Sequence, residues 1–462
     1  MEPRTDLGRA LTSLKMKAQD YKKSTDYYAG EHTLTFATEK FKNAFGPLFR
    51  EFAMNMCPAI CDAVRDKLIV KEFRVEKGSK GEKELPEEAW KIWQANRMGK
   101  RSGEIHLEAV KNGDAYAIVW VDPAGKVTIY PQKAATCTVF YDEETPGKVM
   151  WAAKYWFTTE KKARLNLYYA DRIERYISKN KADGALPEEK QFEPFDGGIK
   201  GGELIKNPYG VVPVFHFANN TDVGSFGNSE LRDAMPVQDA LNKSVLDMLV
   251  AMEFAAFRQR WATGIEVEYD DENKPKSPFI PGADRLWMSE SELANFGSFD
   301  SADLEQFIKV KDGFRTDIAC VTGTPLHYFM LTGASFPQSG ISVEKLESRF
   351  LSKVRDRMEG FGQVWEDLMA FALTIENKGK GVRLFTEWQD PAPIGESERL
   401  QNLILKQTIG VPDETLWSEA GYGEYDIKQM TAAKEAAAEK MVKDFNAGED
   451  LQTGDGSQES GA

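Results

Sequence analysis

The stretch ISVEKLESRFLSKVRDRMEGFGQVWEDLMAFALTI, residues 341–375, predicts one very long helix. Its apolar residues recur at steps of three and four, which places them in a single stripe on a continuous α-helix. The stripe consists of Val343, Leu346, Phe350, Val354, Met358, Phe361, Trp365, Leu368, Ala372 and Ile375. At a rise of ~1.5 Å per residue the helix would be about 50 Å long, which is more than most single domains need. A helix of this length suggests a subunit of a larger assembly.

Two shorter helices precede the long one and are separated by an insert. Pro236 suits the first turn of one helix, and residues 303–321 form the other. The insert, 263–299, has three prolines and is expected to contain short strands and loops. Residues 322–340 contain three glycines and two prolines, yet apolar side chains concentrate at 327–336, where loops are normally polar. This order of segments is unlike an enzyme core.

The first 225 residues predict an α+β region in which helices precede strands. Helices are expected at 1–30, 54–68 and 87–98, with a strand at 69–75. From residue 113 the apolar period changes to two, which predicts one antiparallel meander. Its strands are expected at 115–121, 127–130, 136–141, 149–157, 164–169 and 172–178, and another strand at 211–217. Residues 180–202 are expected to form a flexible surface loop.

The C-terminal part returns to helix. A strand at 382–388 and three helices ending at residue 445 are expected after the long helix. Residues 446–462 are rich in Gly, Ser and acidic residues and offer almost nothing to bury, so a disordered tail is predicted. The predicted fold class is therefore α+β and helix-rich.

Composition places limits on function. The apolar fraction of 42% and the charged fraction of 29% are typical of a soluble globular protein. The net charge of −14 argues against a general nucleic-acid binder, although a protein that lets a polyanion pass without gripping it remains compatible. No signal peptide and no apolar run of ~18 residues occurs, so we expect a soluble protein in a reducing compartment.

Cysteines and tryptophans both favour structural roles. The four cysteines, Cys57, Cys61, Cys137 and Cys320, are too few and too scattered for a disulfide framework. Cys57 and Cys61 share a helix face and are expected to be buried thiols, with a metal pair as the alternative. Helix or strand period also places five tryptophans in the core: Trp90, Trp93, Trp120, Trp151 and Trp156.

Catalytic motifs in the sequence are weak or absent. The sequence has no phosphate-binding G-x-x-x-x-G-K-[ST] motif and no H-E-x-x-H motif. His216 lies in a strand and is expected to be structural. GNSE at 227–230 resembles half of a nucleophile elbow, but capping of a helix by Asn228 or Ser229 explains it better. DDE at 270–272 could bind a divalent ion, although a solvated surface is the more common explanation. We expect no enzyme, no cofactor and no metal site.

Short motifs follow one another along most of the chain. They are YYAGEH at 27–32, the helix-to-strand passage at 55–73, GDAY at 113–116, NPYG and VPV at 207–214, GNSEL at 227–231, QDALNK at 238–243, TGTPLH at 322–327, QSG at 338–340 and GVP at 410–412. In their order and spacing they resemble the portal proteins of tailed bacteriophages, in the long-tailed siphophage group that infects Gram-positive hosts. Each motif alone is weak, and the resemblance covers nearly everything except the tail.

The resemblance implies a division of the chain into parts. Residues 1–225 would be the wing, 226–262 the first stem helix region, 263–300 the clip and 301–322 the second stem helix. Residues 323–340 would be the tunnel loop, and 341–394 the long helix with a strand that returns to the wing. Residues 395–445 would be the crown, followed by the acidic tail at 446–462.

The resemblance also implies a function and partners. The chain would form a dodecameric ring at one capsid vertex, the channel for packaging and ejecting double-stranded DNA without sequence specificity. Implied partners are other copies of the chain, the major capsid and scaffold proteins, the large terminase subunit and a head-completion adaptor, with no membrane. The protein would belong to the virion and assemble in the host cytoplasm. Alternatives are another virion structural protein, such as a minor capsid or adaptor protein, or an unrecognised hydrolase or nuclease.

Candidate site residues come from the same resemblance. The implied tunnel loop contains Tyr328, Phe329, Met330, Leu331, Thr332, Gly333, Ala334, Ser335 and Phe336. Its apolar character departs from family members whose tunnel elements are polar or basic, so contact with DNA is open. Candidate cations that line the tunnel are Lys243, Lys309, Lys311 and Arg315.

Overall fold

The computed structural model describes two compact units. The described residues are 5–32, 54–76, 84–182, 184–198, 201–222, 226–256, 260–264, 293–298, 304–329, 340–379, 381–392, 396–420 and 429–437, with a few single residues between and after these ranges. One unit comprises Met1–Phe336 and Glu347–Pro391, and the other comprises Pro337–Leu346 and Ala392–Ala462. Within the described part of the chain, no helix is both long enough and apolar enough to span a bilayer.

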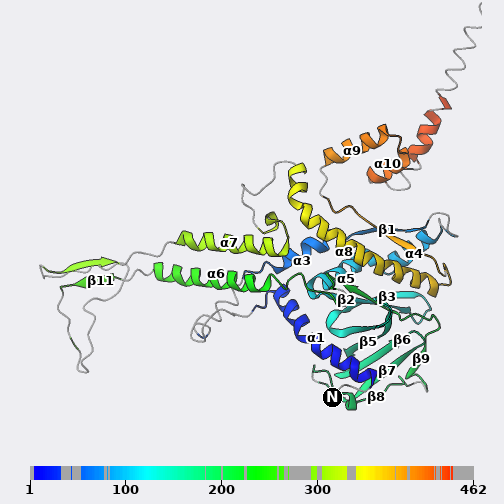
Figure 1. Ribbon diagram of the computed structural model, residues 1–462, viewed down its shortest axis with the longest axis horizontal. Helices are drawn as coiled ribbons and strands as arrows, with labels where there is room; N and C mark the ends of the chain where they lie inside the picture. The colour runs from blue at the N-terminus through cyan, green and yellow to red at the C-terminus, as the bar shows by residue number, and fades with distance from the viewer. Residues whose placement is uncertain are drawn as a thin grey trace, which may run out of the picture. The chain divides into compact units, whose positions relative to one another are not determined.

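Helices and strands occur mostly in separate runs along the chain, as is typical of an α+β fold (Figure 1). The helices are α1 (Asp6–Ala29), α3 (Cys57–Arg65), α4 (Glu84–Ala95), α5 (Met98–Asn112), α6 (Met235–Ala256), α7 (Leu304–Thr322), α8 (Gly340–Ile375), α9 (Glu396–Thr408) and α10 (Asp413–Ala420). The strands are β1 (Val70–Val75), β2 (Asp114–Val121), β3 (Val127–Lys133), β4 (Cys137–Tyr141), β5 (Val149–Phe157), β6 (Lys162–Tyr169), β7 (Arg172–Lys181), β8 (Phe192–Pro194), β9 (Leu204–Lys206), β10 (Val214–Ala218), β11 (Arg260–Thr263), β12 (Asn295–Ser298) and β13 (Leu384–Trp388). The predicted α+β, helix-rich class is confirmed.

The long helix α8 forms the centre of the main core. The stripe residues from Phe350 to Ile375 are all buried, whereas the side chains of Val343 and Leu346 lie outside the described residues. Trp365 packs between Trp93 of α4 and Phe217 of β10, with ring centroids 4.9 and 4.6 Å away. Large apolar side chains at a helical period therefore fix α8 against both helix and sheet.

The strands form two main sheets, so the predicted single meander is wrong. The order in the smaller sheet is β10-β2-β3, and in the larger sheet β4-β5-β6-β7-β8, with β9 also pairing β7. The chain leaves the first sheet through a 3₁₀ turn, Ala134–Thr136, whose Ala134 is buried. Strand β10, almost one hundred residues away from β2, takes the other edge of the smaller sheet.

Two further expectations need correction. The segment 180–202 is not simply a flexible loop, because β8 within it pairs with β7 and buries Phe192. Helix α5 was not predicted, since its buried face includes the polar residues Ser102, His106 and Asn112 in place of a clear apolar stripe.

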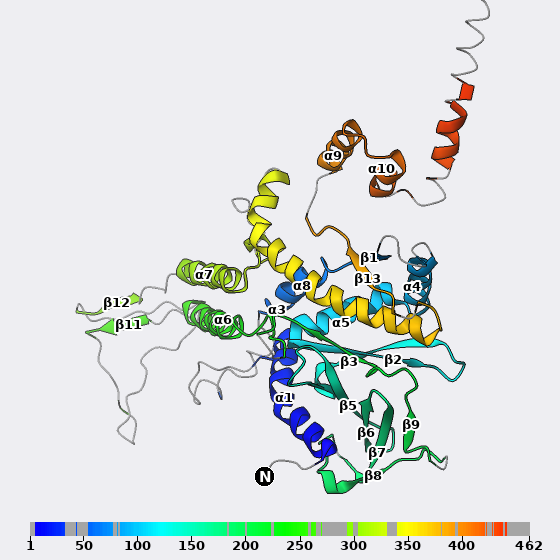
Figure 2. The ribbon, with the colours of Figure 1, turned by 45° about the vertical axis from the view of Figure 1, so that its right-hand side comes forward.

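Helix α1 covers one face of the larger sheet (Figure 2). The Thr5 side chain caps its start by accepting from Gly8 N–H at 3.1 Å, and Gly30 at φ 83° ends it. Its residues Leu7, Leu11 and Leu14 pack with apolar residues of β5 and β6. The opposite face of the sheet is covered only in part, where Ala152, Tyr168 and Ile173 pack with residues of β2 and β10.

The core prediction is confirmed for Cys57 and Cys61 and for two of the five tryptophans. Cys57, Cys61 and Cys137 are buried free thiols, and burial raises the pKa of Cys57 to about 12. Cys320 is exposed. Among the tryptophans, Trp93 and Trp151 are buried, whereas Trp90, Trp120 and Trp156 are half-buried.

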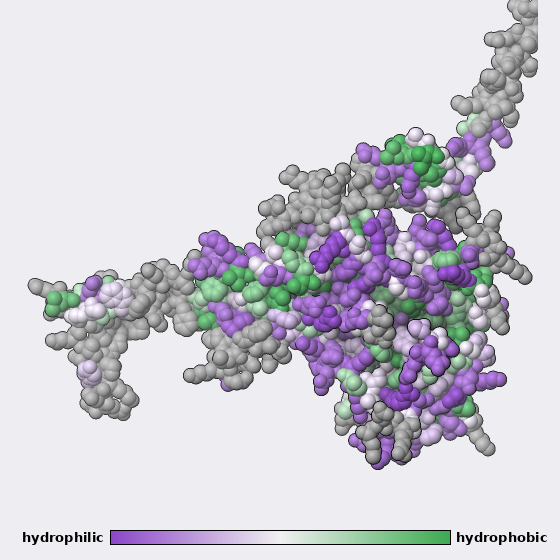
Figure 3. All heavy atoms as spheres, in the orientation of Figure 1, coloured by the Kyte–Doolittle hydropathy of each residue, from purple (hydrophilic) through white to green (hydrophobic). Residues whose placement is uncertain are grey.

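The second unit contains α9 and α10, which confirms that this part of the chain is helical. Leu416 of α10 is buried, but most apolar residues of α9 are exposed, namely Leu400, Ile404 and Leu405, and so is Ile409 directly after the helix. Ile409 reaches 80% exposure. Figure 3 shows hydrophobic residues gathered over these two helices. An apolar face of this kind is typical of a surface that a partner covers.

Candidate functional site

Helices α6 and α7 lie side by side and lead into the antiparallel pair β11–β12 (Figures 1 and 2). Near the start of α6 and the end of α7 the two helices bury apolar residues: Leu241, Val245, Leu246, Ile318 and Ala319. Farther along, Met252, Ile308 and Val310 are 45%, 48% and 46% exposed. The helix pair is therefore packed into the body at its base only.

Side chains of α6 clamp the segment that precedes α3. Gln238 accepts from Met56 N–H at 2.9 Å and donates to the Met54 carbonyl at 2.5 Å. Asn242, one turn later, accepts from Met54 N–H at 3.0 Å. Gln238 and Asn242 are almost fully buried, so these bonds replace the missing backbone partners of residues 54–56.

The end of α1 is tied to the same face of α6. Tyr27 donates its hydroxyl to both carboxylate oxygens of Asp239, each at 2.8 Å. His32 donates from Nε2 to the Tyr27 carbonyl (3.0 Å) and accepts at Nδ1 from Asn242 (2.7 Å). Burial lowers the pKa of His32. The sequence motifs at 27–32 and 238–243 thus build one polar joint.

A buried ionic cluster joins α8 to the bases of α6 and α7. Glu230, just before α6, binds Lys353 at 3.0 Å and Arg357 at 2.8 Å. Lys353 Nζ also donates to the carbonyl of Thr322, the last residue of α7, at 2.9 Å. Burial alone would raise the pKa of Glu230, but the two cations hold that pKa below its usual value. Sequence reasoning missed this cluster, although two cations four residues apart beside the apolar stripe could have signalled a buried anion.

A second buried carboxylate fixes the loop before α6 to the sheet. Asp114, at the start of β2, accepts from Tyr21 (2.5 Å), His216 Nε2 (2.8 Å) and Gly227 N–H (2.8 Å). Burial opposes its ionisation, yet His216 and Lys17 hold the pKa of Asp114 below its usual value. His216 therefore has the structural role that was predicted for it.

Ser229 does not have the surroundings of a nucleophile. Its hydroxyl donates to the carbonyl of Lys111 at 2.5 Å and accepts from Leu231 N–H at 3.0 Å. Ser229 thus caps a turn that precedes α6, and the predicted capping of a helix is wrong, because residues 230–234 form turns and α6 begins at Met235. Within the described residues, no group of three or more His, Cys, Asp or Glu side chains is placed to hold a metal ion. Residues 270–272 lie outside the described part.

The start of the predicted tunnel loop is packed on α8. His327 and Tyr328 lie 3.1 and 3.4 Å from Glu347, a buried carboxylate that also pairs with Lys67 at 3.3 Å. Phe329 is buried in the main core. The other loop residues fall outside the described part of the chain: Met330, Leu331, Thr332, Gly333, Ala334, Ser335 and Phe336.

The four candidate cations differ in their surroundings. Lys243 pairs with Asp247 on α6, Lys309 pairs with Glu305 at 2.9 Å on α7, and Arg315 pairs with Asp312 at 3.1 Å. Lys311 forms no ion pair with a carboxylate of the described residues. Each pair joins residues three or four apart, so these helices carry charges of both signs along their surface.

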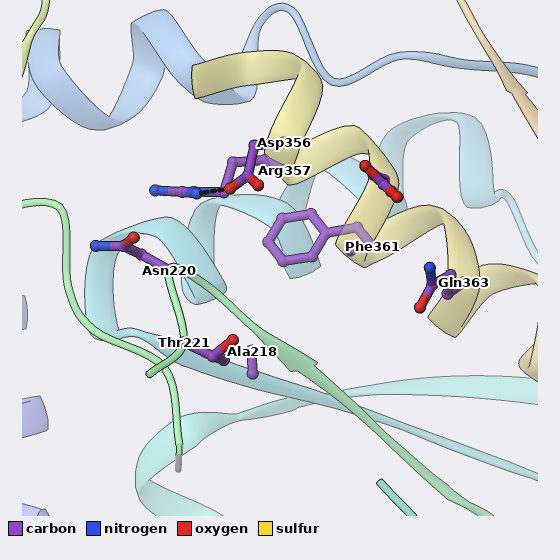
Figure 4. Close-up of a pocket in the computed structure, with 9 residues that line it drawn as sticks. Ala218, Asn220, Thr221, Asp356, Arg357, Phe361 and Gln363 are labelled. Atoms are coloured by element: carbon purple, nitrogen blue, oxygen red, sulfur yellow. Dashed lines mark hydrogen bonds and ion pairs between the residues drawn. The ribbon is translucent and has the colours of Figure 1, made fainter. Parts of the chain in front are cut away.

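A polar hollow lies beside the buried ionic cluster (Figure 4). Its volume is about 350 Å³, and Asn220, Thr221 and Ala218 face Asp356, Arg357 and Phe361 across it. Arg357 is already engaged by Glu230 and Asp356. The hollow therefore offers no spare cation from this arginine to an anionic ligand.

The arrangement of motifs and helices has a clear counterpart among known families. The family model described as "Phage portal protein, SPP1 Gp6-like" matches residues 9–440, which is nearly the whole chain. The chain belongs to this family of phage portal proteins. The expected resemblance to portal proteins is confirmed, and the match includes the helix pair, α8 and the helices of the second unit.

Curated relatives carry the same description. The portal protein of Mycobacterium phage L5 is 24% identical over 394 residues, covering 80% of this chain and 76% of the relative. The portal protein of Mycobacterium phage D29 is 23% identical over 389 residues, with the same coverage. Portal proteins of this family are structural components of phage virions.

Solved structures with a similar chain come from gene transfer agent (GTA) particles. A chain in the neck of an empty particle has a TM-score of 0.48 at 12% identity, covering 82% of this chain and 92% of that one. A chain in the neck of a native particle has a TM-score of 0.44 at 11% identity, covering 83% and 92%.

Proposed function

We propose that this portal-family chain forms a ring, of twelve copies, at one vertex of a phage capsid. Double-stranded DNA would enter and leave through the centre of the ring without sequence readout. The observation that carries the proposal is the family match along residues 9–440. The exposed Met252, Ile308 and Val310 on the helix pair support it, because neighbouring copies in a ring can cover them.

The parts of the ring follow the chain order. Residues 1–225 and the strand returning after α8 form the wing, and the regions 226–262 and 301–322 form the stem. The region 263–300, which contains β12 and the last residue of β11, forms the clip that docks the terminase large subunit and later the head-completion adaptor. Residues 395–445, with α9 and α10, form the crown, and the wing faces the major capsid and scaffold proteins.

The tunnel loop comprises Tyr328 to Phe336 and narrows the channel. The contact of Tyr328 with Glu347 and the burial of Phe329 support this assignment, since they anchor the start of the loop on α8. The apolar residues that follow in the sequence can then touch a duplex or one another without reading bases.

The mechanism is physical and not enzymatic. Lys243, Lys309, Lys311 and Arg315 are proposed to face the channel, where twelve copies multiply each weak phosphate contact. Lys243, Lys309 and Arg315 are paired with carboxylates, which weakens their attraction to DNA phosphates. The duplex can therefore slide through the channel. The protein acts in the virion after assembly in the host cytoplasm.

Electron microscopy of the purified protein in negative stain, with native mass spectrometry, tests the proposal. Rings with a central hole are expected, either for the protein alone or after co-expression with the capsid and scaffold proteins. A small closed oligomer without a channel under both conditions would contradict the proposal and return attention to the alternatives.

A further inference from the structure

The larger sheet carries a group of cations on the face opposite α1. Strand register pairs Trp156 of β5 with Arg164 of β6, Lys154 with Asn166, and Asn166 with Arg175 of β7. Directly paired residues and residues two apart point to the same face of a sheet. Lys154, Arg164 and Arg175 therefore share one face, and we call these three residues the cation cluster.

Aromatic rings hold the cation cluster in place. The Arg164 guanidinium carbon lies 3.4 Å from the ring centroid of Phe195 and 5.2 Å from that of Trp156. Arg175 lies 4.8 Å from the same Phe195 ring, and Lys154 Nζ lies 5.2 Å from Trp156. Stacking on aromatic faces orients the guanidinium planes and occupies their flat faces, not the N–H edges.

The cluster has no counterion in the described part of the chain. None of its three cations forms an ion pair with a described carboxylate, and Arg175 donates to the Gly202 carbonyl at 3.0 Å. The neighbouring Arg172, by contrast, binds Glu174 at 2.8 Å and Asp171 at 3.1 Å. An unpaired group of three cations is notable in a chain whose net charge is −14.

Two polar atoms beside the cluster also lack partners. Arg164 Nε is buried and finds no acceptor, and the side-chain oxygen of Asn166 is buried and finds no donor among the described residues. A buried polar atom without a partner costs free energy, so such atoms point to a ligand or water that completes them. The side-chain oxygen of Asn166 lacks a hydrogen-bond donor, whereas the three cations lack a negatively charged acceptor.

The surroundings of the cation cluster disfavour the charged forms of Lys154 and Arg164. Burial lowers the pKa of Lys154, and burial together with the nearby Arg175 lowers the pKa of Arg164 to about 10. Like charges held together without a counterion destabilise the fold. Residues that cost stability in this way are common where binding is their purpose.

We propose that this face of the larger sheet binds an acidic polypeptide segment. Its carboxylates would pair with the cation cluster, and one of its backbone N–H groups would donate to Asn166. A peptide supplies both the acceptors and the donor that the site lacks, whereas a phosphate diester backbone supplies acceptors only. The negative charge of the whole chain also disfavours a DNA duplex at this site. The inference does not depend on the ring or the channel.

Fluorescence anisotropy of a labelled hexaglutamate peptide tests the site, at low ionic strength and with hexaglutamine as the neutral probe. The full chain should bind hexaglutamate saturably and ignore hexaglutamine. The double variant Arg164→Gln with Arg175→Gln should bind at least about tenfold more weakly. Arg172→Gln, on the same strand but ion-paired on the opposite face, should bind like the natural chain.

Stability provides the second readout. Because the cluster lacks counterions, the double variant should melt at the same temperature as the natural chain or higher, and Lys154→Gln should behave likewise while weakening peptide binding. Three results overturn the proposal: no saturable hexaglutamate binding by the natural chain, unchanged binding by all these variants, or a lower melting temperature for each of them. Tighter binding of a DNA duplex, lost in the double variant, would also overturn it and assign the site to phosphate.

Discussion

At the scale of single residues, polar residues of several motifs connect distant segments of this chain. Asp114, Glu230 and Glu347 are buried carboxylates, and each one connects segments far apart in the sequence. Gly113 and Gly227 allow two distant segments of backbone to come very close to each other. A Cβ added at Gly227 would lie 1.9 Å from the carbonyl oxygen of Gly113, which no real side chain tolerates.

Gly227→Ala is therefore expected to destabilise the chain strongly, by about 2–4 kcal/mol, because backbone atoms of 113 and 227 must move apart. Urea denaturation followed by circular dichroism measures the change. Gly99→Ala is the matched control. It lies in α5 with open space around it, so it should be neutral or stabilise by up to about 1 kcal/mol. Equal effects of the two substitutions would contradict the proposed close approach.

At the scale of elements, local period was enough to predict the helices but not the sheets. Helices α6, α7 and α8 were predicted because their apolar stripes are written within each segment. Helix α5 was missed because it buries Ser102 and His106. The division into two sheets depends on the pairing of β10 with β2, which lie far apart in the sequence, and no local pattern encodes that pairing.

The hydrogen bonds and ion pairs at the base of the helix pair could likewise not be predicted from the sequence. Sequence showed that Gln238, Asn242 and Lys353 are polar, but not that they are buried or what they bind. Only the fold brings Glu230 and Thr322 to Lys353. The cation cluster had a fainter signal, since lysine, asparagine and arginine alternate with apolar residues along β5 and β6.

Lys353→Met tests the joint between α8 and the helix pair. Removing one partner leaves Glu230 with a single cation and deprives the Thr322 carbonyl of its donor, so a loss of about 3 kcal/mol in unfolding free energy is expected. Lys378→Met removes an exposed ion pair with Glu88 and should change the unfolding free energy very little, because solvent screens the pair. Similar costs in denaturant titrations of both variants would show that burial does not strengthen the joint.

At the scale of the whole molecule, stability should fall as the solution becomes moderately acidic. Burial lowers the pKa of His106 to about 3, and its Nε2 accepts from Trp365 Nε1–H at 3.0 Å. In the unfolded chain the His106 imidazole binds a proton near pH 6.5, whereas in the folded chain it stays neutral at that pH. The contribution of His106 is therefore complete above about pH 6.5 and is lost progressively as the pH falls towards about 3.

Denaturant titrations at about pH 6.5 and about pH 5 should differ by about 2 kcal/mol from His106 alone, with His32 adding a smaller change of the same sign. His106→Gln keeps an acceptor for Trp365 and cannot be protonated, so this variant should show a shallower dependence on pH. The same slope in the variant and the natural chain would remove His106 as its source.

The proposed channel makes a prediction about assembled particles. Lys309→Glu or Lys311→Glu should lower the amount of packaged DNA and leave ring assembly intact, because both residues lie on the surface of α7 away from its buried base. DNA content per particle and electron microscopy of the rings measure the two effects. Lys15→Glu, an exposed change on α1, is the control. Normal genome content in the α7 variants would exclude these lysines from the channel.

The pairing of Glu230 with two cations restricts how α8 can move. Lys353 and Arg357 lie one turn apart, so they project from the same side of the helix and meet the same carboxylate. If this part of α8 rotated about its own axis by one residue, about 100°, both cations would move away from Glu230. The buried carboxylate would then have no counterion. Movement of α8 together with the segment before α6 keeps both ion pairs and does not carry that penalty. The angular position of the helix is thus locked to the segment before α6, and any torque on one of them is transmitted to the other.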